Sequence, residues 1–179
     1  MNQLLTLLKT IPEYRTLLEA INLNQSAAVT GIGQINRSHL IAGLRREFDR
    51  PVVVICQDDM AAHRLCQDLK AFLGIEFPIL PSRELTLYDS SVVSRGWEQK
   101  RLRQLYDLSC GNTRLQIMAW DALSLRTMPP AVLKNATFTL QVGSQYNLDN
   151  LIAQLTHIGY SRCGMVEGPG QFAVRGGIV

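Results

Sequence analysis

Residues 51–74, PVVVICQDDMAAHRLCQDLKAFLG, decide the fold of this chain. The run PVVVIC (51–56) is short and β-branched, which is typical of a strand buried on both faces of a sheet. The residues after it predict a helix that Asp58 or Asp59 caps and that Gly74 ends, since glycine readily adopts the left-handed conformation there. The apolar side chains of this helix share one face. They are Ala62, Leu65, Cys66, Leu69, Phe72 and Leu73.

Further strands and helices alternate on either side of this unit. We expect strands at about residues 27–30, at FPIL (77–80) and at LQIMA (115–119), and a helix over residues 97–109. In that helix, Leu102, Leu105 and Tyr106 are expected to face inward, and Lys100, Arg101 and Arg103 mostly outward. Alternating strands and helices predict an α/β domain with a parallel sheet covered by helices.

The pattern changes after residues 129–130. FTLQV (138–142) alternates between apolar and polar residues, residues 148–157 predict a short helix, and the runs CGMVE and QFAVRGGIV are separated by glycines. Short strands divided by glycines are typical of an antiparallel α+β module. Because the apolar pattern reaches residue 179 without a terminating turn, we expect this second domain to be incomplete and the chain to be a piece of a longer polypeptide.

The first residues predict an amphipathic helix, since Leu4, Leu5, Leu8 and Ile11 recur at helical spacing. This start lacks a basic region and a cleavage site, so we do not interpret it as a signal peptide. The predicted domains are therefore a helical segment (1–24), an α/β domain (25–135) and the beginning of an α+β domain (136–179).

Composition narrows the class of protein. The chain has 179 residues, of which 46% are hydrophobic, and its 18 basic and 15 acidic residues give a net charge of +3. It can bury a core, and its basic charge is modest for a nucleic-acid-binding domain. No apolar run approaches the ~18 residues of a membrane span. The four cysteines are scattered without a CxxC pair, as expected for buried thiols in a reducing cytoplasm.

The stretch AAVTGIGQINRS (27–38) looks like a phosphate-binding loop without its functional residues. On the pattern G-x-x-x-x-G-K-[ST], Ala28 falls at the first glycine, Gly33 at the second, Gln34 at the lysine and Ile35 at the hydroxyl. Gln34 and Ile35 cannot supply the cation for the phosphates or the ligand for Mg²⁺. A functional P-loop is therefore not expected.

Three interpretations of Gly31 and Gly33 stay open on the residues alone. They could be a relict P-loop, a tight strand-to-helix turn in which glycine supplies a positive φ, or part of a dinucleotide site. The dinucleotide pattern G-x-G-x-x-G has Asn36 at its third glycine, although Asp58 follows at a plausible distance. A nucleotide- or dinucleotide-binding α/β enzyme that uses Gly31 and Gly33 is the main alternative function.

Three long segments together carry a resemblance to a known family. They are DRPVVVICQDDMAAHRLCQDLKAFLG (49–74), LPSRELTLYDSSVVSRGWEQKRLRQLYDL (80–108) and GYSRCGMVEGPGQFAVRGGIV (159–179). In this order and spacing they resemble the N-terminal part of the bacterial transcription-repair coupling factors, the Mfd family. That part is in turn similar to UvrB, the helicase-like protein of nucleotide excision repair. The chain departs from the family pattern at Gly168, before Pro169, and at Gln171, where an acidic residue is common.

The resemblance implies a fold and a function. The fold would be that of a P-loop helicase domain, UvrB domain 1a, followed by an incomplete α+β domain that binds UvrA. Ala28, Gly31, Gly33, Gln34 and Ile35 would then form a relict P-loop that survives as a turn. Arg175 would contact UvrA. The family's motor, which would use ATP and Mg²⁺, and its contacts with RNA polymerase and DNA belong to domains that are not part of this chain.

From this resemblance we expect a non-catalytic protein-interaction module for DNA repair, without a cofactor or metal of its own. We also expect it to restrain the motor of the parent protein by an intramolecular contact, and to be cytoplasmic. The chain has no DExx box and no arginine finger.

Other candidate residues have simpler interpretations. Glu84, Tyr88 and Asp89 are expected to tie down a loop rather than to form a catalytic pair. Arg95, Lys100, Arg101 and Arg103 could touch a phosphate backbone, although a solvated helix face is the more common arrangement. No role is assigned to the three histidines, His39, His63 and His157, because their spacing does not match a metal site.

Overall fold

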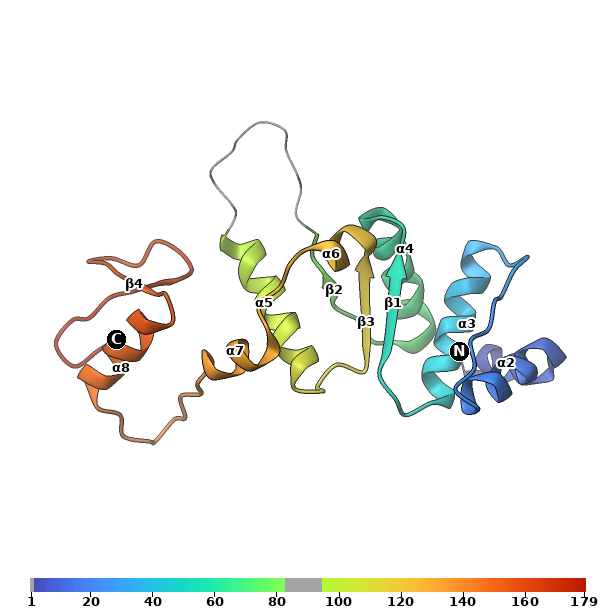
Figure 1. The fold of residues 1–179 in the computed structure, drawn as a ribbon, viewed down its shortest axis with the longest axis horizontal. Coiled ribbons are helices and arrows are strands. Elements are labelled where there is room, and N and C mark those ends of the chain that lie inside the picture. Colours follow the sequence, from blue (N-terminus) through green and yellow to red (C-terminus); the bar gives the residue numbers. More distant parts are fainter. Residues whose placement is uncertain (1, 83–94) are drawn as a thin grey trace, which may run out of the picture. The chain divides into compact units, whose positions relative to one another are not determined.

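The structure is a computed structural model that describes residues 2–82 and 95–179 (Figure 1). Its elements, in chain order, are α1 (Asn2–Leu7), the 3₁₀ helix η1 (Leu8–Thr10), α2 (Pro12–Asn22), α3 (Gln34–Glu47), β1 (Val52–Cys56), α4 (Asp59–Leu73), β2 (Ile79–Leu80), α5 (Arg95–Ser109), β3 (Leu115–Ala119), α6 (Trp120–Ser124), α7 (Pro130–Asn135), α8 (Leu148–His157), β4 (Ser161–Arg162) and β5 (Gln171–Phe172). They form two compact units. The first contains Met1–Arg83 and Gly111–Leu125, and the second Glu84–Cys110 and Arg126–Val179.

The first unit contains a three-stranded parallel sheet in the order β1-β3-β2, as Figure 1 shows. The register aligns Val52 with Leu115 at one end of β1 and Cys56 with Ala119 at the other. Every residue of the central strand β3 is buried. The prediction of a mixed α/β fold with a parallel sheet and flanking helices is confirmed, and such a fold is compatible with a UvrB-like domain.

Helix α4 begins and ends where the sequence predicted. The Asp58 carboxylate accepts a hydrogen bond from the Ala61 backbone N–H at 2.7 Å, and Gly74 ends the helix with φ +71°. The predicted apolar face of α4 points into the core, where Ala62 and Leu69 are fully buried. The helix packs against β3 and β1, so this face closes one side of the sheet (Figure 1).

The N-terminal residues add three short helices to the first unit instead of one long amphipathic helix. Pro12 starts α2, because proline is favoured in the first turn of a helix and disrupts a helix interior. Leu5 and Leu8 are buried as expected, whereas Leu4 and Ile11 are 49% and 44% exposed. Both buried leucines belong to the same hydrophobic cluster as α4 and β3.

Two buried polar side chains link the elements of this core. Ser38 on α3 donates to the Asp68 carboxylate on α4 at 2.7 Å. Gln116 on β3 donates its Nε2–H to the Pro78 carbonyl at 3.1 Å, beside the start of β2. A hydrogen-bonded polar group can be buried without the cost of desolvation that an unpaired one would carry.

Two sequence predictions about the first unit are wrong. No strand forms at residues 27–30, which are exposed and lie in irregular structure. Strand β1 is not buried on both faces, since Val53 and Ile55 are 52% and 49% exposed. The second error has a physical reason: a β-branched run indicates a strand, but the burial of that strand depends on which elements lie over each face.

The second unit contains α5, α7, α8, β4 and β5. The helix predicted at residues 148–157 is confirmed as α8, and the Asn147 side chain caps it by accepting the Asn150 N–H at 3.0 Å. The strand predicted at residues 138–142 does not form. There the Gln141 N–H, which would belong to a strand ladder, donates instead to the Tyr146 hydroxyl at 2.7 Å.

The predicted antiparallel pairing of this unit is wrong as well. β4 and β5 pair in parallel, with Ser161 opposite Gln171 and Arg162 opposite Phe172. Residues 163–167, which were predicted to form a strand, form a loop. In the part of the chain that the structure describes, no helix has both the length and the apolar character needed to cross a membrane. Glu84, Tyr88 and Asp89 lie outside the described residues.

Candidate functional site

The glycine stretch forms an exposed turn at the start of α3. Gly31 has φ +76°, a conformation that suits glycine, and Gly33 is the N-cap residue with φ −70° and ψ 170°. Gln34 is the first residue of the helix, and the Ile35 side chain is 56% exposed. Ala28 lies in the exposed segment before the turn.

This turn lacks the enclosure of a phosphate-binding loop. A Cβ atom added to Gly31 or Gly33 would meet no atom within 4 Å, so nothing packs closely around either glycine. No strand leads into the turn within the described residues. At the lysine position stands the neutral amide of Gln34, and at the hydroxyl position the apolar chain of Ile35. The arrangement can start a helix, but these two positions supply neither the cation for phosphate nor the hydroxyl for Mg²⁺.

Arg175 lies at a tight turn in the second unit. The Arg175 and Ile178 backbones exchange two hydrogen bonds, of 3.0 and 3.2 Å, across Gly176 and Gly177. Gly176 has φ +60°, so the turn requires a residue that tolerates the left-handed region. The Arg175 side chain is exposed, and its Nη2 donates to the Gly164 carbonyl at 3.1 Å.

The strand before Arg175 anchors this turn in the unit. Phe172 is only 5% exposed, and Val174 is half-buried. Arg175 is exposed, as expected if alternate side chains lie on opposite faces of an extended segment. The segment therefore carries an exposed guanidinium at Arg175 and a buried ring at Phe172.

Gln171 is a residue whose contacts sequence reasoning missed. Its side-chain oxygen accepts hydrogen bonds from the backbone N–H groups of Glu167 and Gly168, at 2.9 and 3.2 Å. The sequence carried one signal, which is the departure from the family pattern at residue 171. The contact itself crosses a loop, and a loop has no periodic pattern from which such a contact could be predicted.

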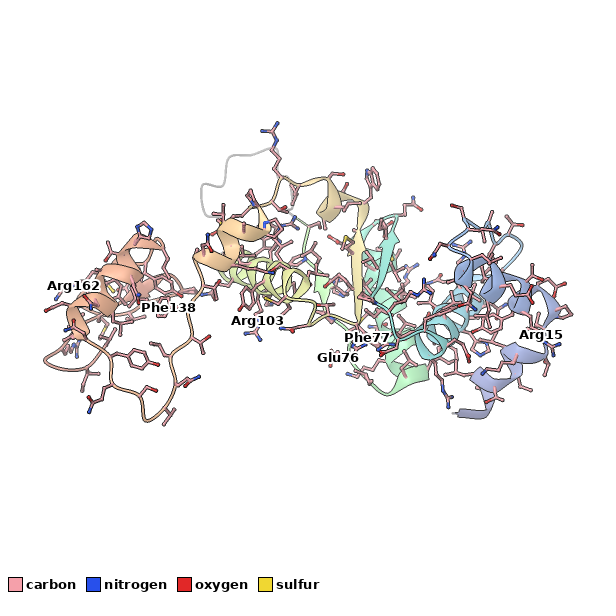
Figure 2. All side chains as sticks on the ribbon, turned by 60° about the horizontal axis from the view of Figure 1, so that its bottom comes forward. Arg15, Glu76, Phe77, Arg103, Phe138 and Arg162 are labelled. Carbon is pink, nitrogen blue, oxygen red and sulfur yellow. The ribbon has the colours of Figure 1, made fainter. Side chains whose placement is uncertain are left out.

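The basic helix α5 differs from its prediction. Arg101 is 6% exposed, and its guanidinium lies 5.9 Å from the centre of the Trp97 ring, while Leu102 is 42% exposed. Burial lowers the pKa of Arg101. Arg103, labelled in Figure 2, does face solvent, with 78% of its side chain exposed. It pairs with Asp107 at 2.9 Å. The expectation that Arg101 faces outward is wrong, so this helix offers fewer cations to a nucleic-acid backbone than the sequence suggested.

The histidines and cysteines do not form a metal site in the described part of the chain. His39 stacks on Phe72, with ring centres 5.1 Å apart, and its Nε2 lies 2.9 Å from the Leu4 carbonyl oxygen. This histidine therefore joins α1, α3 and α4. Burial, and then the charge of Asp58, raise the pKa of the Cys56 thiol, which favours its inert protonated form.

Comparison with known proteins gives two findings. Residues 138–179 match the UvrB interaction domain family. The whole chain is similar to transcription-repair-coupling factors: it is 25% identical to the Bacillus subtilis protein over 181 residues, which cover 100% of this chain. It is 28% identical to the Myxococcus xanthus protein over 93% of this chain, and 26% identical to a Staphylococcus aureus protein over 100%.

The chain spans only about 15% of the length of these relatives, 14% for the Myxococcus xanthus protein. The predicted resemblance to the transcription-repair coupling factors is confirmed. The alternative of a nucleotide- or dinucleotide-binding enzyme is not favoured by these matches. The matched UvrB interaction segment includes Arg175.

Proposed function

We propose that this chain is the N-terminal, UvrB-like module of a transcription-repair coupling factor and acts as a non-catalytic protein-interaction module. The parent protein would be an ATP-dependent DNA translocase that displaces stalled RNA polymerase and recruits the excision-repair machinery. The observation that carries the proposal is the match of residues 138–179 to the UvrB interaction domain, within a chain similar from end to end to coupling factors.

The partner of this module would be UvrA, bound through a surface centred on Arg175. RNA polymerase and DNA would be bound by other parts of the parent protein, and ATP and Mg²⁺ by its motor. We further propose that the module restrains that motor by an intramolecular contact, that it binds no cofactor of its own, and that it works in the cytoplasm.

The surroundings of Arg175 support its role as an anchor. Its side chain is exposed and makes a hydrogen bond to the Gly164 carbonyl, while Phe172, three residues earlier in the chain, is buried. An arginine fork can bind a carboxylate with two parallel hydrogen bonds, and arginines are frequent among the residues that dominate binding energy. UvrA would present an acidic group to this position.

Substitution of Arg175 tests the proposal directly. Arg175→Ala should weaken the binding of purified UvrA to this chain by about 2 kcal/mol, or roughly thirtyfold in Kd, because it removes the anchor. Arg175→Lys should restore only part of the affinity, since a point charge cannot replace the fork. Biolayer interferometry with immobilised chain measures both.

Arg162→Ala is the matched control, because Arg162 is an exposed arginine of the same unit (Figure 2). It should bind UvrA as the parent chain does. Circular dichroism should show each variant to be folded. Equal UvrA affinity of Arg175→Ala and the parent chain would show that this surface is not where UvrA binds.

A further inference from the structure

The loop between β4 and β5 is folded around one side chain. Gln171 accepts hydrogen bonds from two successive backbone donors of this loop, Glu167 N–H at 2.9 Å and Gly168 N–H at 3.2 Å. The Cys163 thiol also lies 4.0 Å from the same oxygen atom. Backbone N–H groups outside helices and sheets need such partners, and the Gln171 side chain pairs two of them in this loop, those of Glu167 and Gly168.

The two ends of the loop are fixed by the short sheet. Ser161 N–H donates to the Gly170 carbonyl and Cys163 N–H to the Phe172 carbonyl, both at 2.9 Å. In the middle of the loop, the Gln171 side chain holds Glu167 and Gly168. Gly164 follows Cys163, which the sheet holds, and precedes Glu167 and Gly168, which Gln171 holds.

That carbonyl is the acceptor for the Arg175 guanidinium, at 3.1 Å. The next two residues of the loop, Met165 and Val166, are apolar and are 68% and 52% exposed. The loop therefore carries the Gly164 carbonyl, which binds the Arg175 guanidinium, and directly after it in sequence two exposed apolar side chains.

We propose that Gln171 is a positioning residue for the Arg175 docking surface: through residues 163–170 it fixes the Gly164 carbonyl that orients the guanidinium, and it holds Met165 and Val166 beside it. This inference rests on the proposed function. The fitting partner surface carries a carboxylate next to apolar side chains.

The physical basis is preorganisation. A free arginine side chain has many rotamers, and fixing them on binding costs affinity. A guanidinium already held by Gly164 loses less freedom when it meets a carboxylate, and it keeps further N–H donors for that carboxylate. If the loop were released, Arg175 would keep its charge but lose its fixed direction.

The test compares two substitutions of Gln171 in the full 179-residue chain. Gln171→Leu removes the acceptor at similar volume, whereas Gln171→Glu keeps it. Amide hydrogen exchange at Glu167 and Gly168, measured on the chain alone, should speed up in Gln171→Leu and stay slow in Gln171→Glu. UvrA binding should weaken about three- to tenfold in Gln171→Leu, the expected cost of ordering one long side chain, and by less than about threefold in Gln171→Glu.

A double-mutant cycle shows whether Gln171 acts through Arg175. In an Arg175→Ala background, Gln171→Leu should cause a smaller loss of UvrA affinity than in the unsubstituted chain. An equal loss in both backgrounds, or unchanged affinity of Gln171→Leu while Arg175→Ala binds weakly, overturns the inference and leaves the proposed function intact. Unchanged affinity of Arg175→Ala itself overturns the proposed UvrA-binding surface at Arg175. If Gln171→Leu does not fold, loss of UvrA binding by folded Gln171→Glu still overturns the inference.

Discussion

Gly43 on α3 has no room for a side chain, which makes Gly43→Ala a sensitive test of how the N-terminal helices pack. A Cβ atom at this position would lie 2.5 Å from Leu8 Cδ1 and 2.9 Å from the Tyr14 hydroxyl. Carbon atoms pack at about 3.5–4.0 Å, so Leu8 would have to withdraw by about 1 Å. Leu8 and Tyr14 are only 7% and 4% exposed, so both would have to move within a packed core.

Two opposing effects set the size of the change. Overpacking of a core costs about 1–3 kcal/mol, whereas replacing glycine by alanine inside a helix stabilises it by about 1 kcal/mol. We therefore expect Gly43→Ala to lower the free energy of unfolding by about 1 kcal/mol, because the two clashes fall on buried atoms. Urea unfolding followed by circular dichroism should show the midpoint shifted down by roughly 0.3–1 M.

A second substitution identifies the cause. Leu8→Ala removes the closest clash, so it should be less costly in the Gly43→Ala background than in the parent chain, where truncating a buried leucine costs about 2–5 kcal/mol. Additive costs of the two substitutions would contradict the contact between η1 and α3. If Gly43→Ala alone instead raised the free energy of unfolding by about 1 kcal/mol, helix propensity would dominate and this site would be loosely packed.

Two further predictions concern a buried hydroxyl and the glycine stretch. Tyr14→Phe should not lower stability at pH 7, because the Tyr14 hydroxyl is buried without a hydrogen-bond partner among the described residues. Burial, and then the charge of Glu47, raise the folded-state pKa of Tyr14 to about 12, so the parent chain should lose stability relative to Tyr14→Phe as the pH rises from about 10 to about 12, measured as urea midpoints. Isothermal titration should detect no Mg·ATP binding to the parent chain, and micromolar binding at Gly31–Gly33 would contradict the relict-loop interpretation.

Residues whose structure depends on near neighbours in sequence could be predicted. Asp58 caps α4 and Gly74 ends it in a left-handed turn, so both act on residues a few positions away. The strand at 115–119 is indicated by its own apolar run. The apolar face of α4 is likewise set by its spacing. These local patterns were enough to give the parallel sheet and its covering helix.

Residues whose environment is set by distant parts of the chain could not be predicted. The exposure of Val53 and Ile55 could not be predicted, because nothing in the run PVVVIC indicates which face of the sheet is covered. Arg101 was assigned to solvent by its charge, yet the long stem of an arginine can be buried and its guanidinium can lie over an aromatic ring. The helical spacing alone did not say which face of α5 would be covered.

The same limit applies to the candidate site. The resemblance pointed to Arg175, but the bond from Arg175 to Gly164 and the two bonds to Gln171 cross a loop that was predicted to be a strand. A strand would have paired those backbone groups with a neighbour. In the loop these backbone groups bond to side chains instead, so the contacts of Gln171 could be found only from the structure.

The start of α3 shows quantitatively why a glycine turn before a helix does not by itself bind a nucleotide. The helix dipole places partial positive charge at Gly33 and Gln34, which favours an anion by about 0.3–1 kcal/mol at an exposed site. Micromolar affinity requires about 8 kcal/mol. In a functional P-loop the lysine, the magnesium ligand and an enclosing set of backbone N–H groups supply the difference. Here Gln34 is neutral, Ile35 is apolar and half-exposed, and the glycines have open space around them. Restoring Gln34→Lys and Ile35→Thr would supply the two side chains but not the enclosure, so we expect this double variant to bind Mg·ATP weakly and to hydrolyse none.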